Sequence, residues 1–170
     1  IQLGGLPAGV TNCEQSGAAC IETNDSRNVT AYWFGGAVWA AHTVGCTQGG
    51  ALAPCVQWYE VGNLDGATTL LQQGFVDNPA NPGRQRYFPS LAVDSTGSVV
   101  LGYGYSSASE YPGVAYSTIS PSGETGPETV LKTGQATYFS TRYGDYASTA
   151  LDPQDNLTIW HMQEYAKASD

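Results

Sequence analysis

The stretch RYGDYASTALDPQDNLTIWHMQEYA, residues 142–166, repeats the pattern of RQRYFPSLAVDSTGSVVLGYGYSS, residues 84–107. At a constant offset of 58 residues, four identities connect the two copies: Arg84 with Arg142, Ser90 with Ser148, Ala92 with Ala150, and Asp94 with Asp152. Each copy alternates small and apolar residues, crosses a turn that opens with aspartate, and resumes in a second alternating segment. The pattern therefore predicts a β-hairpin that is used twice, with Asp capping each turn.

A third copy, less similar in sequence, lies N-terminal to these two. AVWAAHTVGC aligns with SVVLGYGYSS at an offset of 61, which makes His42, Tyr103 and His161 equivalent. VQWYEVG, residues 56–62, then aligns with GVAYSTI, residues 113–119, at an offset of 57, which matches Tyr59 to Tyr116. A unit of about 60 residues with four short antiparallel strands is typical of a β-propeller blade.

These repeats predict an all-β fold, a β-propeller segment of about three four-stranded antiparallel blades. Residues 28–80 and 81–138 are the two fuller repeats, and residues 139–170 form an incomplete third. Residues 1–27 are expected to be a disulfide-stapled loop or the tail of a preceding blade. A propeller ring needs about four to eight blades, so we expect further blades from the same or another chain to complete a larger or multi-chain propeller.

Composition excludes several classes of protein. The chain has 170 residues, of which 41% are hydrophobic, and a formal net charge of −9, which leaves no basic surface for nucleic acid. No apolar run reaches the about 18 residues of a membrane span. The chain begins at Ile1, not Met, and we expect that a leader has been removed or that the chain has been trimmed. A secreted or cell-surface location follows as the prediction.

The four cysteines support an oxidising, extracytoplasmic compartment. The simplest pairing is local, Cys13 with Cys20 and Cys46 with Cys55, although other connectivities remain open. Zinc is disfavoured because the cysteine spacings lack a C-x-x-C knuckle and the two histidines are distant. Calcium at residues 152–156 is disfavoured because too few oxygen ligands are close in sequence. We therefore predict no metal and no cofactor.

Part of the chain resembles a known family. The segment from Arg84 to Ala166 is similar to secreted bacterial β-propellers of the sialidase-like superfamily, which carry an Arg-Trp-Gly-Asp-Tyr opening, an Asp-Pro turn and a Glu-Tyr-Ala ending. The matching residues are Arg142, Gly144, Asp145, Tyr146, Asp152, Pro153, Asp155, Trp160, Glu164, Tyr165 and Ala166. Tyr143 replaces the usual Trp, and the Asp-boxes of true sialidases are missing. The resemblance implies the propeller fold and does not carry over a catalytic centre.

A glycoside hydrolase of the sialidase-like type is the enzymatic alternative. Such an enzyme needs two carboxyl groups at a cleft, and sialidases use a tyrosine nucleophile with arginine clamps. The candidates are Asp145 and Glu164 as carboxyls and Tyr143 or Tyr146 as the phenol, with Arg84 and Arg142 as clamps. The repetition of the arginine favours a structural role instead, as a tie to a neighbouring repeat.

Aromatic residues suggest a binding surface. Arg142, Tyr146, Trp160, Trp58 and Tyr59 are the candidate binding residues. The Tyr-rich strand YGYSSASEY, residues 103–111, together with Trp58 and Tyr59 could form an aromatic platform for sugar rings. The alternative is that the rings pack between blades. The sequence therefore predicts a module for binding or scaffolding, with a carbohydrate or protein ligand, in a cell-surface or secreted assembly. A purely structural subunit of a larger complex is the other alternative.

Overall fold

The computed structural model describes residues 12–23, 30–48, 51–76, 81–140, 142–144 and 146–168. Within these ranges the chain is all-β, without a helix, and every strand pairing is antiparallel, which confirms the predicted class. The strands are β1 (Asn12–Gln15), β2 (Ala18–Glu22), β3 (Thr30–Phe34), β4 (Ala37–Gln48), β5 (Ala51–Gly62), β6 (Thr69–Phe75), β7 (Gln85–Val93), β8 (Val99–Ser107), β9 (Glu110–Ile119), β10 (Thr129–Lys132), β11 (Ser148–Leu151) and β12 (Ile159–Met162).

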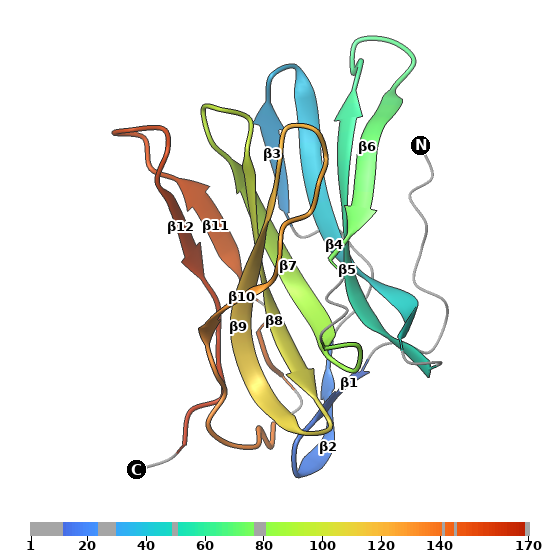
Figure 1. The fold of residues 1–170 in the computed structure, drawn as a ribbon, viewed down its shortest axis with the longest axis vertical. Helices are drawn as coiled ribbons and strands as arrows, with labels where there is room; N and C mark the ends of the chain where they lie inside the picture. Colours follow the sequence, from blue (N-terminus) through green and yellow to red (C-terminus); the bar gives the residue numbers. More distant parts are fainter. Residues whose placement is uncertain are drawn as a thin grey trace.

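Two of the sheets have four strands each, in which every strand pairs with its neighbour in sequence. The first sheet runs β3-β4-β5-β6, and the middle sheet runs β7-β8-β9-β10. β11 and β12 form the C-terminal hairpin, and β1 and β2 form a smaller hairpin within the segment that was expected to be a loop or tail. Figure 1 shows the first sheet, the middle sheet and the C-terminal hairpin side by side.

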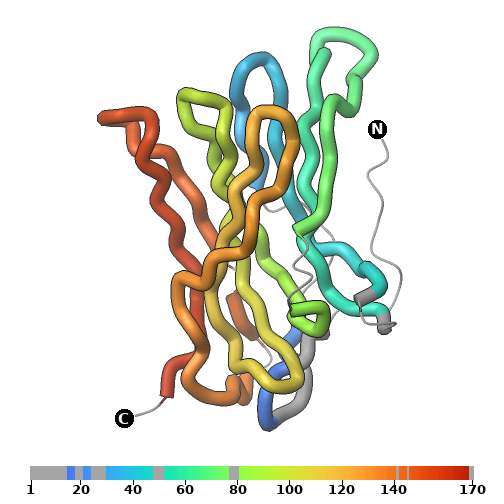
Figure 2. Tube along the Cα trace, viewed as in Figure 1, coloured from blue at the N-terminus to red at the C-terminus, as the bar shows by residue number. Residues whose placement is uncertain are grey.

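The hairpins that open these three units point the same way. The turns of β3–β4, β7–β8 and β11–β12 lie at one end of the molecule (Figure 2). Glycine makes the tightest of these turns possible, because Gly35 and Gly36 have φ values of 60° and 85° in the connection of β3 to β4. Two consecutive left-handed residues are what a two-residue hairpin turn requires. The first sheet, the middle sheet and the C-terminal hairpin thus share the direction of their first hairpin.

Strand register corrects one equivalence that was predicted from the repeats. Val93 pairs with Val99 across the middle sheet's first turn, whereas Leu151 pairs with Ile159 in the C-terminal hairpin. The second turn is longer, so the strands that follow it match at a larger offset than the strands that precede it. His161 therefore corresponds to Leu101 of β8 and not to Tyr103.

A second equivalence was also wrong, by one residue. Ala41 pairs with Trp58, and its counterpart Gly102 pairs with Tyr116, so Tyr116 corresponds to Trp58 and not to Tyr59. The difference matters because a shift of one residue moves a strand side chain to the opposite face of its sheet.

Hydrogen bonds agree with the corrected register and with the predicted match of His42 to Tyr103. His42 Nε2 lies 3.0 Å from the Tyr59 hydroxyl, and the Tyr103 hydroxyl lies 2.9 Å from Ser117 Oγ. In each sheet the bond joins the second strand to the third at the same relative position. Ser117 is therefore the counterpart of Tyr59.

The main core fills the space between the first and middle sheets. Trp39 and Trp58 from the first sheet stack with ring centroids 5.8 Å apart. Leu101 and Tyr103 of β8 are buried in the same cluster. Burial of such large rings supplies a major part of the folding free energy, because each removes much apolar surface from water.

The C-terminal hairpin covers the opposite face of the middle sheet. Thr149 Oγ1 donates a hydrogen bond to the Ser90 carbonyl at 2.9 Å, which joins β11 to β7. Gly102 of β8 lies directly under the His161 ring, where a Cβ atom would overlap the imidazole. The first sheet, the middle sheet and the C-terminal hairpin are therefore stacked face to face, and glycine is what allows the close approach of β12.

The disulfide between Cys46 and Cys55 confirms one of the two predicted local pairings. It joins β4 to β5, with the Cα atoms 5.9 Å apart. The side chains of Cys13 and Cys20 lie outside the described residues, so their pairing stays a prediction.

Candidate functional site

The candidate aromatic residues separate into two groups. Trp58 and Tyr59 are buried, and Trp58 Nε1 donates to Thr125 Oγ1 at 3.2 Å across the interface between the first and middle sheets. Trp160 and Tyr146 are 64% and 86% exposed. Of these candidate rings, those of Trp160 and Tyr146 are therefore the ones that a ligand can reach in this structure.

The residues proposed for catalysis hold the chain near the C-terminal hairpin. The Tyr143 side chain is buried, and its hydroxyl donates to the Glu164 carbonyl at 2.8 Å. The Glu164 carboxylate accepts the backbone N–H of Gly144 at 3.0 Å. Arg142 is exposed, and Asp145 lies outside the described residues. Tyr143 and Glu164 thus have structural hydrogen bonds that account for their positions.

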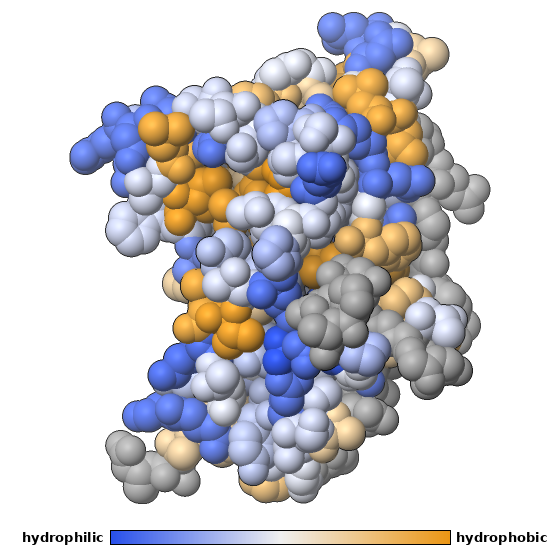
Figure 3. Space-filling view, viewed as in Figure 1, coloured by the Kyte–Doolittle hydropathy of each residue, from blue (hydrophilic) through white to orange (hydrophobic). Residues whose placement is uncertain are grey.

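A groove separates the C-terminal hairpin from part of the middle sheet. Its volume is about 410 Å³, and its lining residues are Asp94, Val100, Tyr116, Leu131, Leu157, Ile159, Trp160 and His161. On the face shown in Figure 3, hydrophobic atoms gather in the hollow between the hairpin and the middle sheet. The volume lies within the range of ligand sites, about 300–1,000 Å³, so this groove is the candidate functional site.

His161 forms part of the groove wall. Thr149 Oγ1 has one hydrogen, which it donates to Ser90, so the 2.8 Å contact with His161 Nδ1 requires the imidazole to donate there. The other ring nitrogen, Nε2, is buried without a hydrogen-bond partner among the described residues. Burial lowers the pKa of His161, partly opposed by a hydrogen bond to the Ser148 backbone. The neutral imidazole is therefore the form that fits between the hairpin and β8.

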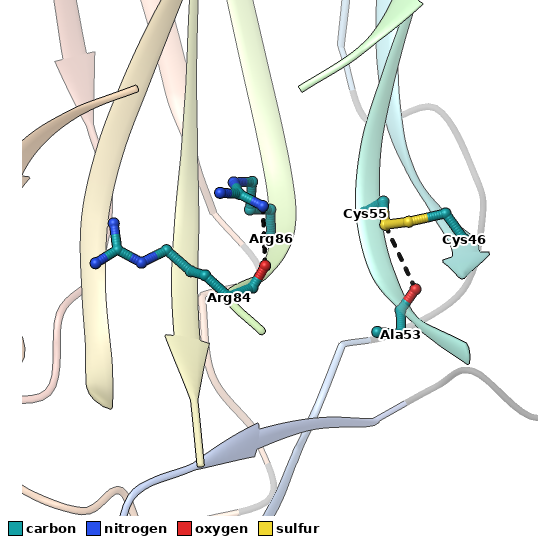
Figure 4. Close-up of a disulfide and its surroundings, with 5 residues drawn as sticks. All are labelled: Cys46, Ala53, Cys55, Arg84 and Arg86. Carbon is teal, nitrogen blue, oxygen red and sulfur yellow. Dashed lines mark hydrogen bonds between the residues drawn. A yellow bond between two sulfur atoms is a disulfide. The ribbon is translucent and has the colours of Figure 1, made fainter. Parts of the chain in front are cut away.

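Two arginines and two glutamates form a largely buried ionic cluster at the start of β7. Arg84 Nη1 donates to Glu128 Oε1 at 2.6 Å, and Arg86 Nε donates to Glu128 Oε2 at 2.7 Å. Arg84 also forms an ion pair with Glu110. Figure 4 shows the two arginines at the end of the middle sheet, near the Cys46–Cys55 disulfide.

The environment of this cluster favours its charged forms. Burial opposes ionisation of Glu128, but hydrogen bonding and charge from Arg86, together with the charge of Arg84, outweigh it and lower the pKa of the carboxyl. Burial would lower the pKa of Arg84 too, yet its hydrogen bond to Glu110 and the charge of Glu128 raise it. Arg84 also lies over the Tyr105 ring, 4.1 Å from its centroid. The cluster is thus a structural tie within the middle sheet.

Other kinds of site find no support in the part of the chain that the structure describes. No group of three or more His, Cys, Asp or Glu side chains there could hold a metal ion. None of its segments is a helix long and apolar enough to span a membrane. Comparisons of the chain with protein-family models, with curated proteins and with solved structures gave no match.

Proposed function

We propose that the chain is a segment of an extracytoplasmic β-propeller that works by binding and scaffolding. The observation that carries this proposal is the face-to-face stacking of sheets with the same strand order. Such stacking of four-stranded antiparallel sheets is the construction principle of propellers. The resemblance of residues 84–166 to secreted sialidase-like propellers supports the same conclusion, and the Cys46–Cys55 disulfide supports an oxidising compartment.

The two ends of the stack support an assembly role. Trp33 pairs with Val38, and its counterpart Val93 pairs with Val99. Val93 is buried against the first sheet, whereas Trp33 is 61% exposed on the outer face of that sheet. Trp33 is thus an exposed apolar residue at a position whose counterpart in the middle sheet, Val93, is buried.

The C-terminal hairpin, at the other end of the stack, also exposes an apolar residue. Trp160 occupies the position in β12 that Trp39 occupies in β4 and Val100 in β8. Trp39 is buried between two sheets, but Trp160 lies on the outer side of the C-terminal hairpin. We infer that both ends of the stack pack against further sheets of the same kind, and that this packing is the scaffolding function.

Self-association of the purified chain tests this proposal. We expect light scattering to give at least twice the 17.9 kDa of a monomer, because the exposed end faces can pack on each other. Replacing Trp33 with Lys should return the mass to that of a monomer, since a charge would then be desolvated in the contact.

Leu64→Lys is the control for this experiment, because Leu64 is exposed in the turn between β5 and β6, away from both end faces. It should associate like the unmodified chain. A folded, soluble monomer of the unmodified chain would contradict the proposal.

A further inference from the structure

The C-terminal hairpin has an open edge at a place where the other two sheets carry a third strand. β4 pairs with β3 on one side and β5 on the other, and β8 pairs with β7 and β9 in the same way. β12 has only β11 as a partner among the described residues. An unpaired strand edge presents backbone N–H and C=O groups that can template another strand.

The register identifies the backbone groups on that open edge. Asp152 N–H donates to the Thr158 carbonyl, so these residues form a hydrogen-bonded pair. Hydrogen-bonded and non-hydrogen-bonded pairs alternate along an antiparallel ladder. Trp160 and Met162 therefore bond to β11, whereas the N–H and C=O groups of Ile159 and His161 point to the open edge.

The groove lies beside this edge, in the space that a third strand and its following turn would fill. In the interface between the first and middle sheets, Trp58 contacts the turn after β9 through Thr125 and packs near Gly123. Trp58 is buried there, while its counterpart Tyr116 lines the open groove. The groove beside the C-terminal hairpin thus lies at the position that the turn after β9 covers in the interface between the first and middle sheets.

Charge indicates what kind of strand fits. The chain carries a net charge of −9, and Asp94 is the charged residue that lines the groove. Its other lining residues are mostly apolar or aromatic. An incoming strand would therefore combine apolar side chains toward the groove with basic residues toward the acidic surface.

We propose that β12 and the adjacent groove bind an extended, basic β-strand of a partner polypeptide, with apolar residues at alternate positions. The strand pairs with the open edge at Ile159 and His161 and places its apolar side chains against Tyr116 and Leu131. This inference rests on the proposed function, because it treats the C-terminal hairpin as an incomplete copy of the two preceding sheets. Beyond the proposed function, the inference specifies which strand edge binds the partner and what kind of strand the partner supplies.

Amide hydrogen exchange measured by NMR tests the site directly. The probe is a synthetic peptide with the sequence of residues 113–119, GVAYSTI, and added terminal lysines, because β9 is the strand that pairs with β8. We expect the peptide to slow exchange at the amides of Ile159 and His161 and to leave those of Trp160 and Met162 unchanged. A peptide with proline in place of Ser117 should give no protection, since Ser117 pairs with Leu101, the counterpart of His161, and proline lacks the N–H donor.

Two matched variants test the groove. Leu131 and Leu71 lie on the edge strands β10 and β6 and are 52% and 53% exposed, but only Leu131 lines the groove. We expect Leu131→Lys to weaken peptide binding about tenfold, from lost apolar burial and like-charge repulsion, and Leu71→Lys to leave it unchanged. Equal effects of the two variants, absence of binding, or protection at another strand edge would overturn the inference.

The outcomes also separate this inference from the proposed function. A chain that stays monomeric yet shows peptide-dependent protection of Ile159 and His161 would contradict the end-face packing alone. A chain that associates through its end faces without such protection would contradict the strand site alone.

Discussion

Replacing Glu128 with Gln is expected to destabilise the chain by about 3–5 kcal/mol, the effect of removing one partner from a buried ion pair. Its carboxylate accepts hydrogen bonds from both Arg84 and Arg86 and has no exposed side-chain surface. Arg84 would keep its pair with Glu110, but Arg86 would lose its ion pair with Glu128 and retain a buried charge. Chemical denaturation monitored by circular dichroism measures the loss.

Two comparisons make this result specific. Glu22→Gln, at an exposed position of β2, should change the free energy of unfolding by less than about 0.5 kcal/mol. The double variant Arg86→Met with Glu128→Gln should be more stable than Glu128→Gln alone, because it removes the unpaired charge. A double variant that is less stable than the single one would show that the cluster does not act through charge pairing.

The Glu128 carboxylate also contributes to the loss of folding stability at low pH. Because the pKa of Glu128 in the folded chain lies below its ordinary value of 4.5, the unfolded chain binds more protons in the interval between the two. The stabilisation is complete above that ordinary value and is lost as the pH falls through the folded-state pKa. Glu128→Gln should therefore show a shallower loss of stability in acid than the unmodified chain.

Replacing Trp58 with Ala should destabilise the chain by about 3–5 kcal/mol, because a large ring is removed from a closed interface and leaves a cavity. The Trp58 ring stacks on Trp39 and bonds to Thr125 of the middle sheet, so it joins the first two sheets. Urea denaturation followed by far-ultraviolet circular dichroism provides the measurement without relying on tryptophan fluorescence.

Trp160→Ala is the matched control, because Trp160 is also a strand tryptophan but is exposed and bonds only to the Asp152 carboxylate in the described part of the chain. Its loss should cost less than about 1 kcal/mol. Similar losses for the two tryptophan variants would contradict the assignment of Trp58 to a packed interface between sheets.

Local patterns predicted the hairpins but not the full register. Alternation and turn residues sufficed for β7–β8 and β11–β12, since both depend on neighbours in sequence. The longer turn before Ile159 shifted the match of His161, and similarity of residue type misplaced Tyr59 against Tyr116. Register is set by pairing with the adjacent strand and by the face that must be buried, neither of which residue identity alone reveals.

The site was harder to predict for the same reason. Arg84 was identified as a repeated arginine with a structural role, but its partner Glu128 is distant in sequence and no local pattern connects them. Arg142 shares the repeat position of Arg84 and is nevertheless exposed. The groove depends on Tyr116, Leu131 and His161, which three different strands bring together, so only the tertiary arrangement defines it.

One NOESY spectrum of the folded chain tests the stacking of the three units most directly. We expect a cross-peak between the Trp58 ring and Gly123, across the first and middle sheets, and another between the His161 ring and Gly102, across the middle sheet and the C-terminal hairpin. Absence of both cross-peaks in a spectrum that retains the strand pairings within each sheet would show that the sheets form without stacking face to face.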